Sequence, residues 1–299
     1  RLADYVIELH FPDLAGSSDQ YMRLFAEAVV RTARLVAAWQ SVGWSHGVLN
    51  TDNMSILGLT LDYGPYGFMD DYDPGFICNH SDHNGRYAFN QQPYIGLWNL
   101  SCLAQTLLPL AEKNDLKAAL DTYQPTFDRE YRRLMRAKMG LMEERAEDDE
   151  LLQELLSLLA GSRVDYTIFF RKLGDVVTVT HPSPFKGEGE GRGLNNDLRD
   201  FFLNRERFDA WAVRYRDRLR SEQSCDAERR ERMNRVNPLY VLRNYLAQIA
   251  IEKAQQNDFS EIDRLLTLLQ DPFTERPGMS SYAAAPPNWG KHIAVSCSS

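Results

Sequence analysis

The sequence predicts an α+β protein that is predominantly α-helical, and three observations support this. From residue 94 onward, apolar residues recur at intervals of three and four, which is the spacing of one helix face. Residues 54–61 are short, apolar and interrupted by Gly58, a pattern typical of two short strands. No internal repeat occurs, which disfavours a solenoid. We therefore expect a small β element in front of a helical bundle.

The first long helix is expected from about residue 21 to residue 42. Asp19 is a suitable N-cap, and Gly43 is suited to end the helix. Apolar residues between them fall on one stripe at helical spacing: Leu24, Phe25, Ala28, Val29, Leu35, Val36 and Trp39. This stripe predicts a face that packs in the core.

The remaining helices and loops follow from the same patterns. Helices are expected at residues 98–111, 116–142, 148–161, 201–222, 238–254 and 259–270. Residues 62–76 are rich in Gly, Pro and Asp, which indicates a long ordered loop. The glycines of residues 176–198 lack the third glycine of a dinucleotide-binding motif, so this segment is expected to be a flexible acidic loop.

Composition excludes several functional classes. The net charge of −8 argues against nucleic-acid and anionic-membrane partners, because both require a basic face. No apolar run approaches the roughly 20 residues that cross a bilayer. The four scattered cysteines fit a reducing compartment. His80 and His83 have a spacing compatible with metal ligation, but no further ligand follows at the usual distance, so we expect them to order their loop.

The stretch HGVLNTDN, residues 46–53, carries the chemistry. The catalytic loop of protein kinases reads H-R-D-L-x-x-x-N, in which the Asp accepts a proton and the Asn holds a metal ion. His46 and Asn53 keep this separation of seven residues, but Val48 occupies the position of the acid. Asp52 supplies a carboxylate in the same loop, and it is the candidate proton acceptor if the hydroxyl approaches from another direction.

Asp62 lies nine residues after Asn53, in LTLDYGP, like the metal-binding Asp of the kinase D-F-G motif. A hairpin centred on Leu57 and Gly58 would place residues 53 and 62 opposite one another. An amide oxygen and a carboxylate would then hold one Mg²⁺ ion. Leu-Gly is not a favoured two-residue turn, so a slipped register and a longer loop stay open.

These residues resemble the selenoprotein O family, called YdiU in many bacteria. The resemblance begins with the segment from HGVLNTDN through LDYGPYGFMDDYDPGFICNHSDHNGRYAFNQQP and includes the later NPLYVLRNYLAQIAIEKA and PPNWGKHIAVSCSS. It implies a protein-kinase-like fold that transfers AMP from ATP to Ser, Thr or Tyr hydroxyls of proteins and releases pyrophosphate. UMP transfer from UTP, with Mn²⁺, is the implied variant.

The resemblance also implies roles for individual residues. Asp52 matches the proton acceptor, and Asn53 and Asp62 match the metal ligands, with Asp62 also approaching the nucleotide phosphates. Cys297 occupies the position of selenocysteine in eukaryotic members, and it is implied to pair with Cys78 in a redox-regulated disulfide. Two free thiols in a reducing cytosol are the alternative.

The implied domain organisation is a kinase-like C-terminal lobe at residues 1–175, the acidic loop at 176–198 and a helical extension with the cysteine tail at 199–299. The Gly-rich loop, the strand Lys and its Glu partner of kinase-like ATP sites are not found upstream of the motif. We therefore expect a C-terminal part of a longer bacterial cytoplasmic protein, inactive without its N-terminal lobe. A small-molecule phosphotransferase and a non-catalytic, redox-regulated interaction module are the alternatives.

Overall fold

The computed structural model describes residues 1–178 and 195–296. These residues form two compact units, and each is described by itself. Unit 1 contains residues 1–66, 75–134 and 294–296, and unit 2 contains residues 67–74 together with the described part of 135–293. In the described residues, helices predominate and the two strands are only two residues long, which agrees with the predicted α+β class.

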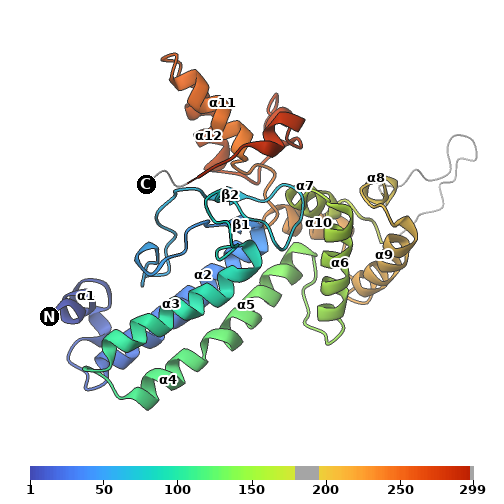
Figure 1. Cartoon of the computed structure of the whole chain (residues 1–299). Coiled ribbons are helices and arrows are strands. Elements are labelled where there is room, and N and C mark those ends of the chain that lie inside the picture. Colours follow the sequence, from blue (N-terminus) through green and yellow to red (C-terminus); the bar gives the residue numbers. More distant parts are fainter. Residues whose placement is uncertain (179–194, 297–299) are drawn as a thin grey trace, which may run out of the picture. The chain divides into compact units, whose positions relative to one another are not determined.

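Unit 1 is built around the long helix α2, Gln20–Val42. Asp19 occupies the predicted N-cap position, although its side chain makes no capping hydrogen bond, and Gly43 ends the helix as predicted, in the left-handed conformation with φ 70°. Helix α2 packs against α3 and α4, which run beside it in Figure 1. The other elements of this unit are α1 (Leu2–His10), η1 (Pro12–Leu14), β1 (Trp44–Ser45), η2 (Thr51–Asn53), η3 (Phe89–Gln91), α3 (Gln92–Leu107), α4 (Lys113–Asp121) and the first part of α5 (Tyr123–Lys138).

The predicted hairpin at residues 54–61 is wrong, because this segment forms no strand. The Ser55 carbonyl accepts a hydrogen bond from the Gly58 amide at 3.1 Å and turns the chain. A Cβ atom on Gly58 would lie 2.7 Å from Cβ of Arg31, so the turn packs against α2. The Trp39 indole, also on α2, donates to the Thr60 hydroxyl at 2.9 Å. The segment therefore uses the long helix as its partner.

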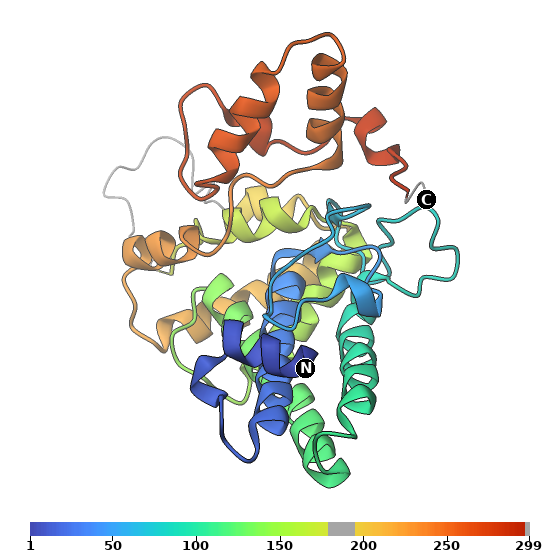
Figure 2. The same cartoon turned by 90° about the vertical axis from the view of Figure 1, so that its left-hand side faces the viewer.

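Unit 2 consists of shorter helices. Helix α6 packs against α9, and α11 packs against α12, as Figure 2 also shows. The elements of this unit are β2 (Gly67–Phe68), α6 (Asp148–Ser162), α7 (Tyr166–Leu173), α8 (Asn195–Arg199), α9 (Arg205–Arg220), α10 (Asp226–Asn234), α11 (Asn244–Ala254), α12 (Ser260–Leu269), η4 (Ser280–Ala283) and η5 (Asn288–His292). Helices α7, α8 and α10 were not expected from the sequence, and most of α8 lies within residues 176–198, which were predicted to be a loop.

The helix predicted at residues 116–142 is divided into α4 and α5 at Thr122. Pro125 explains the division, because it has no N–H to donate to the carbonyl of Asp121 in a continuous helix. It occupies the first turn of α5, where an N–H is not needed. The Thr122 hydroxyl caps the end of α4 by donating to the Ala119 carbonyl at 2.7 Å.

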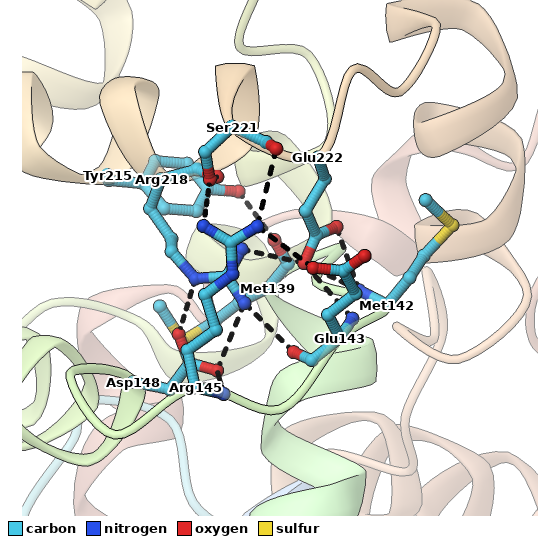
Figure 3. Close-up of polar contacts among 9 residues, drawn as sticks. All are labelled: Met139, Met142, Glu143, Arg145, Asp148, Tyr215, Arg218, Ser221 and Glu222. Carbon is cyan, nitrogen blue, oxygen red and sulfur yellow. Dashed lines mark hydrogen bonds and ion pairs between the residues drawn. The ribbon is translucent and has the colours of Figure 1, made fainter.

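A buried ionic network in unit 2 joins α9 to the start of α6, and we call it the Arg218 cluster (Figure 3). It consists of Arg218, Asp148 and Glu222. The Arg218 guanidinium donates to Asp148 at 2.6 Å and to Glu222 at 2.7 Å. Glu222 also accepts the Met142 amide at 2.9 Å. Every charge of the cluster therefore has an opposite charge beside it.

In the described part of the chain, no helix is long and apolar enough to cross a membrane. Most of the predicted acidic loop at 176–198 lies outside the described residues. The expected domain boundaries stay predictions.

Candidate functional site

The loop of residues 46–53 leaves β1 and ends in η2, within unit 1. Its backbone is held by side chains rather than by strand pairing. Five carbonyl groups in and next to the loop each accept a hydrogen bond from a neutral side chain: Trp44 from Gln92 at 3.0 Å, Ser45 from the Cys78 thiol at 3.5 Å, Gly47 from Asn79 at 3.3 Å, Val48 from Asn53 at 2.9 Å and Leu49 from Asn99 at 3.0 Å. This satisfies buried backbone acceptors that a strand ladder would otherwise serve.

His46 connects this loop to the segment that carries Asp62. Its side chain is buried, and its Nε2 lies 3.1 Å from the Leu61 carbonyl oxygen. A carbonyl oxygen can only accept, so Nε2 carries the proton and donates, and Nδ1 accepts from the Val48 amide at 3.4 Å. Burial lowers the pKa of His46, and the Leu61 carbonyl, the Asp62 charge and the Asn53 carbonyl offset part of that effect.

The structure places the three predicted site residues as follows. Asp52 is exposed in η2, where solvent and a large substrate can reach its carboxylate. Asn53 is half-buried, and its amide nitrogen is used by the Val48 carbonyl, which leaves Oδ1 for another partner. Asp62 is exposed and has φ 56°, in the left-handed region that Asp and Asn tolerate better than most residues. Both residues are connected to His46 through a neighbour: Asp62 follows Leu61, whose carbonyl accepts from His46, and Asn53 donates to the carbonyl of Val48, whose amide donates to His46.

The donor set fits a hard divalent cation. An amide oxygen and a carboxylate are ligands that Mg²⁺ and Mn²⁺ accept, with the remaining positions left to phosphate and water. Among residues 1–178 and 195–296, no three His, Cys, Asp or Glu side chains gather as a metal cluster. This includes His80 and His83. Two protein ligands would leave the other positions of such a cation to water or to a bound anion.

Gly47 explains why the motif has a glycine directly after the histidine. It has φ 81°, and a Cβ atom there would lie 2.6 Å from the Pro65 carbonyl oxygen and 2.8 Å from Sγ of Cys78. Both contacts are shorter than real Cβ atoms make. The 46–53 loop, the segment after Asp62 and the Cys78 loop therefore meet at this one position.

Cys78 is buried, and its sulfur lies 3.5 Å from the Ser45 carbonyl oxygen, whereas Cys297 lies outside the described residues. The amide of His80 donates to the Val295 carbonyl at 2.7 Å. This bond joins the chain two residues after Cys78 to the chain two residues before Cys297. The implied pairing of the two cysteines stays a prediction.

Sequence reasoning missed the residues that hold the loop. Gln92 and Asn99 are buried polar residues on the otherwise apolar α3. They are seven residues apart, so they lie on the same helix face two turns apart, and that spacing is a signal the sequence contains. Tyr87 was also missed; its hydroxyl donates to the Asn50 side chain, in the loop itself.

Comparison with known proteins finds relatives that match this chain along its whole length. Residues 1–270 match the family model described as "Protein adenylyltransferase SelO". The chain is 57% identical over 298 residues to the "Protein nucleotidyltransferase YdiU" of Myxococcus xanthus, and 55% identical over 305 residues to that of Thioalkalivibrio sulfidiphilus. It is 53% identical over 299 residues to the protein of the same name from Cronobacter sakazakii. Each comparison covers 100% of this chain and 59% of the relative.

Proposed function

Because the chain belongs to the SelO family of protein adenylyltransferases, we propose that it carries the proton acceptor and metal ligands of a protein nucleotidyltransferase. The full-length enzyme transfers AMP from ATP to Ser, Thr or Tyr hydroxyls of proteins, and pyrophosphate leaves. The alternative reaction of this enzyme is the transfer of UMP from UTP. The chain spans 59% of the length of the curated relatives it matches. We expect it to be inactive without the rest of the enzyme.

The observation that carries this proposal is the position of His46. The buried imidazole of His46 donates to the carbonyl of Leu61, the residue directly before Asp62, and accepts from the amide of Val48, whose carbonyl accepts from Asn53. The two candidate metal ligands come from separate segments, and this ring fixes both segments relative to each other. A non-catalytic scaffold has no need for that arrangement.

Each residue has one role in the reaction. The Asp52 carboxylate is exposed, so the hydroxyl of a protein substrate can approach it and give up its proton. Asn53 and Asp62 would hold Mg²⁺ or Mn²⁺, and Asp62 would also approach the nucleotide phosphates. When bound, the cation supplies positive charge that offsets the negative charge of the nucleotide phosphates. Redox control through Cys78 and Cys297 is a further part of this proposal.

The test uses a full-length enzyme that carries this chain, with ATP labelled at either the α or the γ phosphate. We expect label from the α position to become covalently attached to protein. Label from the γ position instead would mean that the enzyme is a phosphotransferase, and no label from either would mean that it is an interaction module.

Two substitutions separate the roles. Asp52→Ala should lower transfer by about 10²-fold or more and largely spare nucleotide binding. Asp62→Asn, which keeps the left-handed backbone conformation accessible, should weaken both nucleotide transfer and nucleotide binding. Asp115→Ala, on exposed α4, is the matched control and should change neither.

A further inference from the structure

We propose that Arg86, together with Trp98 and Tyr94, forms a docking surface for acidic segments of the protein substrate. This inference rests on the proposed function, because it concerns the polypeptide that presents its hydroxyl to Asp52. We call these three residues the Arg86 surface. All of them lie in unit 1, on α3 and on the loop before it.

The Arg86 guanidinium is a preorganised cation. Its Cζ lies 5.0 Å from the centre of the Trp98 ring and 5.6 Å from that of the Tyr87 ring. Its Nε donates to the Tyr87 hydroxyl at 3.3 Å. These contacts fix the planar group against aromatic faces, so little side-chain freedom is lost when a carboxylate binds.

The charge of Arg86 has no acidic partner in an ion pair among the described residues. The nearest carboxylate in its loop is Asp82, and both oxygens of that group are used by backbone amides. One accepts from Arg86 N at 2.9 Å and the other from Tyr87 N at 2.8 Å. In a chain with a net charge of −8, this exposed cation is therefore available to an anion from outside.

Trp98, which contacts Arg86, and Tyr94, one helical turn before it, are both exposed. Tyr94 is 63% exposed and Trp98 is 42% exposed. They are four residues apart on α3, so they share one helix face. Arg, Trp and Tyr are the residues most enriched at the energetic centres of protein interfaces, whereas single exposed apolar residues are ordinary on any surface.

The Arg86 surface is connected to the 46–53 loop by hydrogen bonds. Arg86 donates to the Tyr87 hydroxyl, which donates to Asn50, and the Asn50 carbonyl accepts from the Asn53 amide at 3.1 Å. This turn presents Asp52, the candidate proton acceptor. Arg86 and the turn that carries Asp52 therefore belong to one hydrogen-bonded network in unit 1. The exposed Trp98 and Tyr94 on α3 favour a polypeptide as the occupant, because such aromatic residues and Arg recur at protein interfaces.

The test measures peptide preference with a full-length enzyme and ATP labelled at the α phosphate. Three peptides carry one Ser in the same frame, flanked by Glu, Gln or Lys. We expect the wild type to prefer Glu over Gln over Lys, and Arg86→Glu to reverse the order, with kcat/KM for the Glu peptide lowered roughly tenfold or more. The KM for ATP should not change.

Three further variants test how Arg86 and Trp98 each contribute to the peptide preference. Arg86→Lys keeps the charge but loses the stacked plane, so its preference should be intermediate. Trp98→Ala should weaken binding of all three peptides without reversing their order. Lys113→Glu makes the same charge change at the start of α4, beyond the far end of α3, and should leave the order unaltered.

Each outcome has a defined meaning. An unchanged order in Arg86→Glu would overturn the docking proposal, and so would a raised KM for ATP with an unchanged KM for peptide. Labelling confined to the enzyme itself, with none of the peptides, would overturn it and leave the proposed function standing. Absence of α label on any protein or peptide would contradict the proposed function as well.

Discussion

The 46–53 loop of unit 1 and the Arg218 cluster of unit 2 are held by different chemistry. Neutral amide and thiol groups hold the loop, and its carboxylates at Asp52 and Asp62 stay exposed. In the Arg218 cluster the charged groups are buried and neutralise one another (Figure 3). The buried charges of the Arg218 cluster are paired with one another. The exposed carboxylates of Asp52 and Asp62 remain accessible to a ligand. This contrast distinguishes a candidate site from a structural network.

The largest effect should come from breaking the paired network. Arg218→Met leaves Asp148 and Glu222 buried without a counter-charge, and we expect the free energy of unfolding to fall by about 3–5 kcal/mol. Urea denaturation measures this. Arg214→Met is the control: Arg214 is 46% exposed and pairs with Glu150 and Glu154, so its loss should cost less than about 1 kcal/mol. Equal losses of unfolding free energy in Arg218→Met and Arg214→Met would show that the buried and the exposed ion pairs contribute alike.

The neutral network can be broken at Gln92. Its side chain accepts from the His46 amide at 2.9 Å and donates to the Trp44 carbonyl, so Gln92→Leu leaves two buried backbone groups unsatisfied. We expect a loss of about 2–4 kcal/mol in unfolding free energy and slower AMP transfer. Gln91→Leu, at the neighbouring exposed position, is the control. A stable Gln92→Leu protein with full activity would contradict this role.

Lys138 is the exception in unit 2, because it is buried without an ion pair among the described residues. Its Nζ lies 4.5 Å from the centre of the Phe170 ring and 5.4 Å from that of Tyr166. Burial lowers the pKa of Lys138 to about 7. Between pH 7 and pH 10 the unfolded chain binds a proton that the native chain does not, so stability should rise with pH in that window.

Replacement of Lys138 tests this directly. Lys138→Met removes the titrating group, so the unfolding free energies measured at pH 7 and pH 10 should differ by about 3 kcal/mol less than in the wild type. Lys172→Met, which removes an exposed lysine over the Phe201 ring, should keep the wild-type pH dependence. An unchanged pH profile in Lys138→Met would show that the lysine is not desolvated.

The smallest effect should come from Tyr87. Tyr87→Phe removes one hydrogen bond to Asn50, which costs about 1 kcal/mol and should lower kcat for AMP transfer roughly fivefold. The fold should persist, because the ring is retained. Tyr5→Phe, on exposed α1, provides the comparison and should leave kcat as it is. A Tyr87→Phe enzyme with wild-type kcat would show that the Tyr87 hydroxyl is not needed for the conformation of the 46–53 loop.

Local patterns predicted much of the fold. The bounds of α2 follow from a cap residue, an apolar stripe and a terminal glycine, all of which are local properties. The division between α4 and α5 at Thr122 also has a local signal, Pro125. It was missed because apolar residues continue at helical spacing on both sides of it. Helix α10 was missed because its sequence, DAERRERMN, is so polar that no apolar stripe can be recognised.

The candidate site was predicted only in part, for a physical reason. The motif spacing predicted Asp52, Asn53 and Asp62 as candidate site residues, and the structure places them at exposed or half-buried positions. The predicted hairpin failed because Gly58 and Thr60 find their partners on α2, about 20 residues or more away in the chain. Gln92 and Asn99 act on carbonyls more than 40 residues away. Such long-range pairings leave only a weak trace in the local pattern.

The close fit at Gly47 has a consequence for how this protein can vary. A single added methyl group would meet the Pro65 carbonyl, which cannot rotate out of the way. Three stretches of chain thus share a space too small for a side chain, and a shift in one must be matched by the other two. Residues at the exposed edge of this region can therefore be changed one at a time, whereas a change in any of the three segments that meet at Gly47 requires matching changes in the other two.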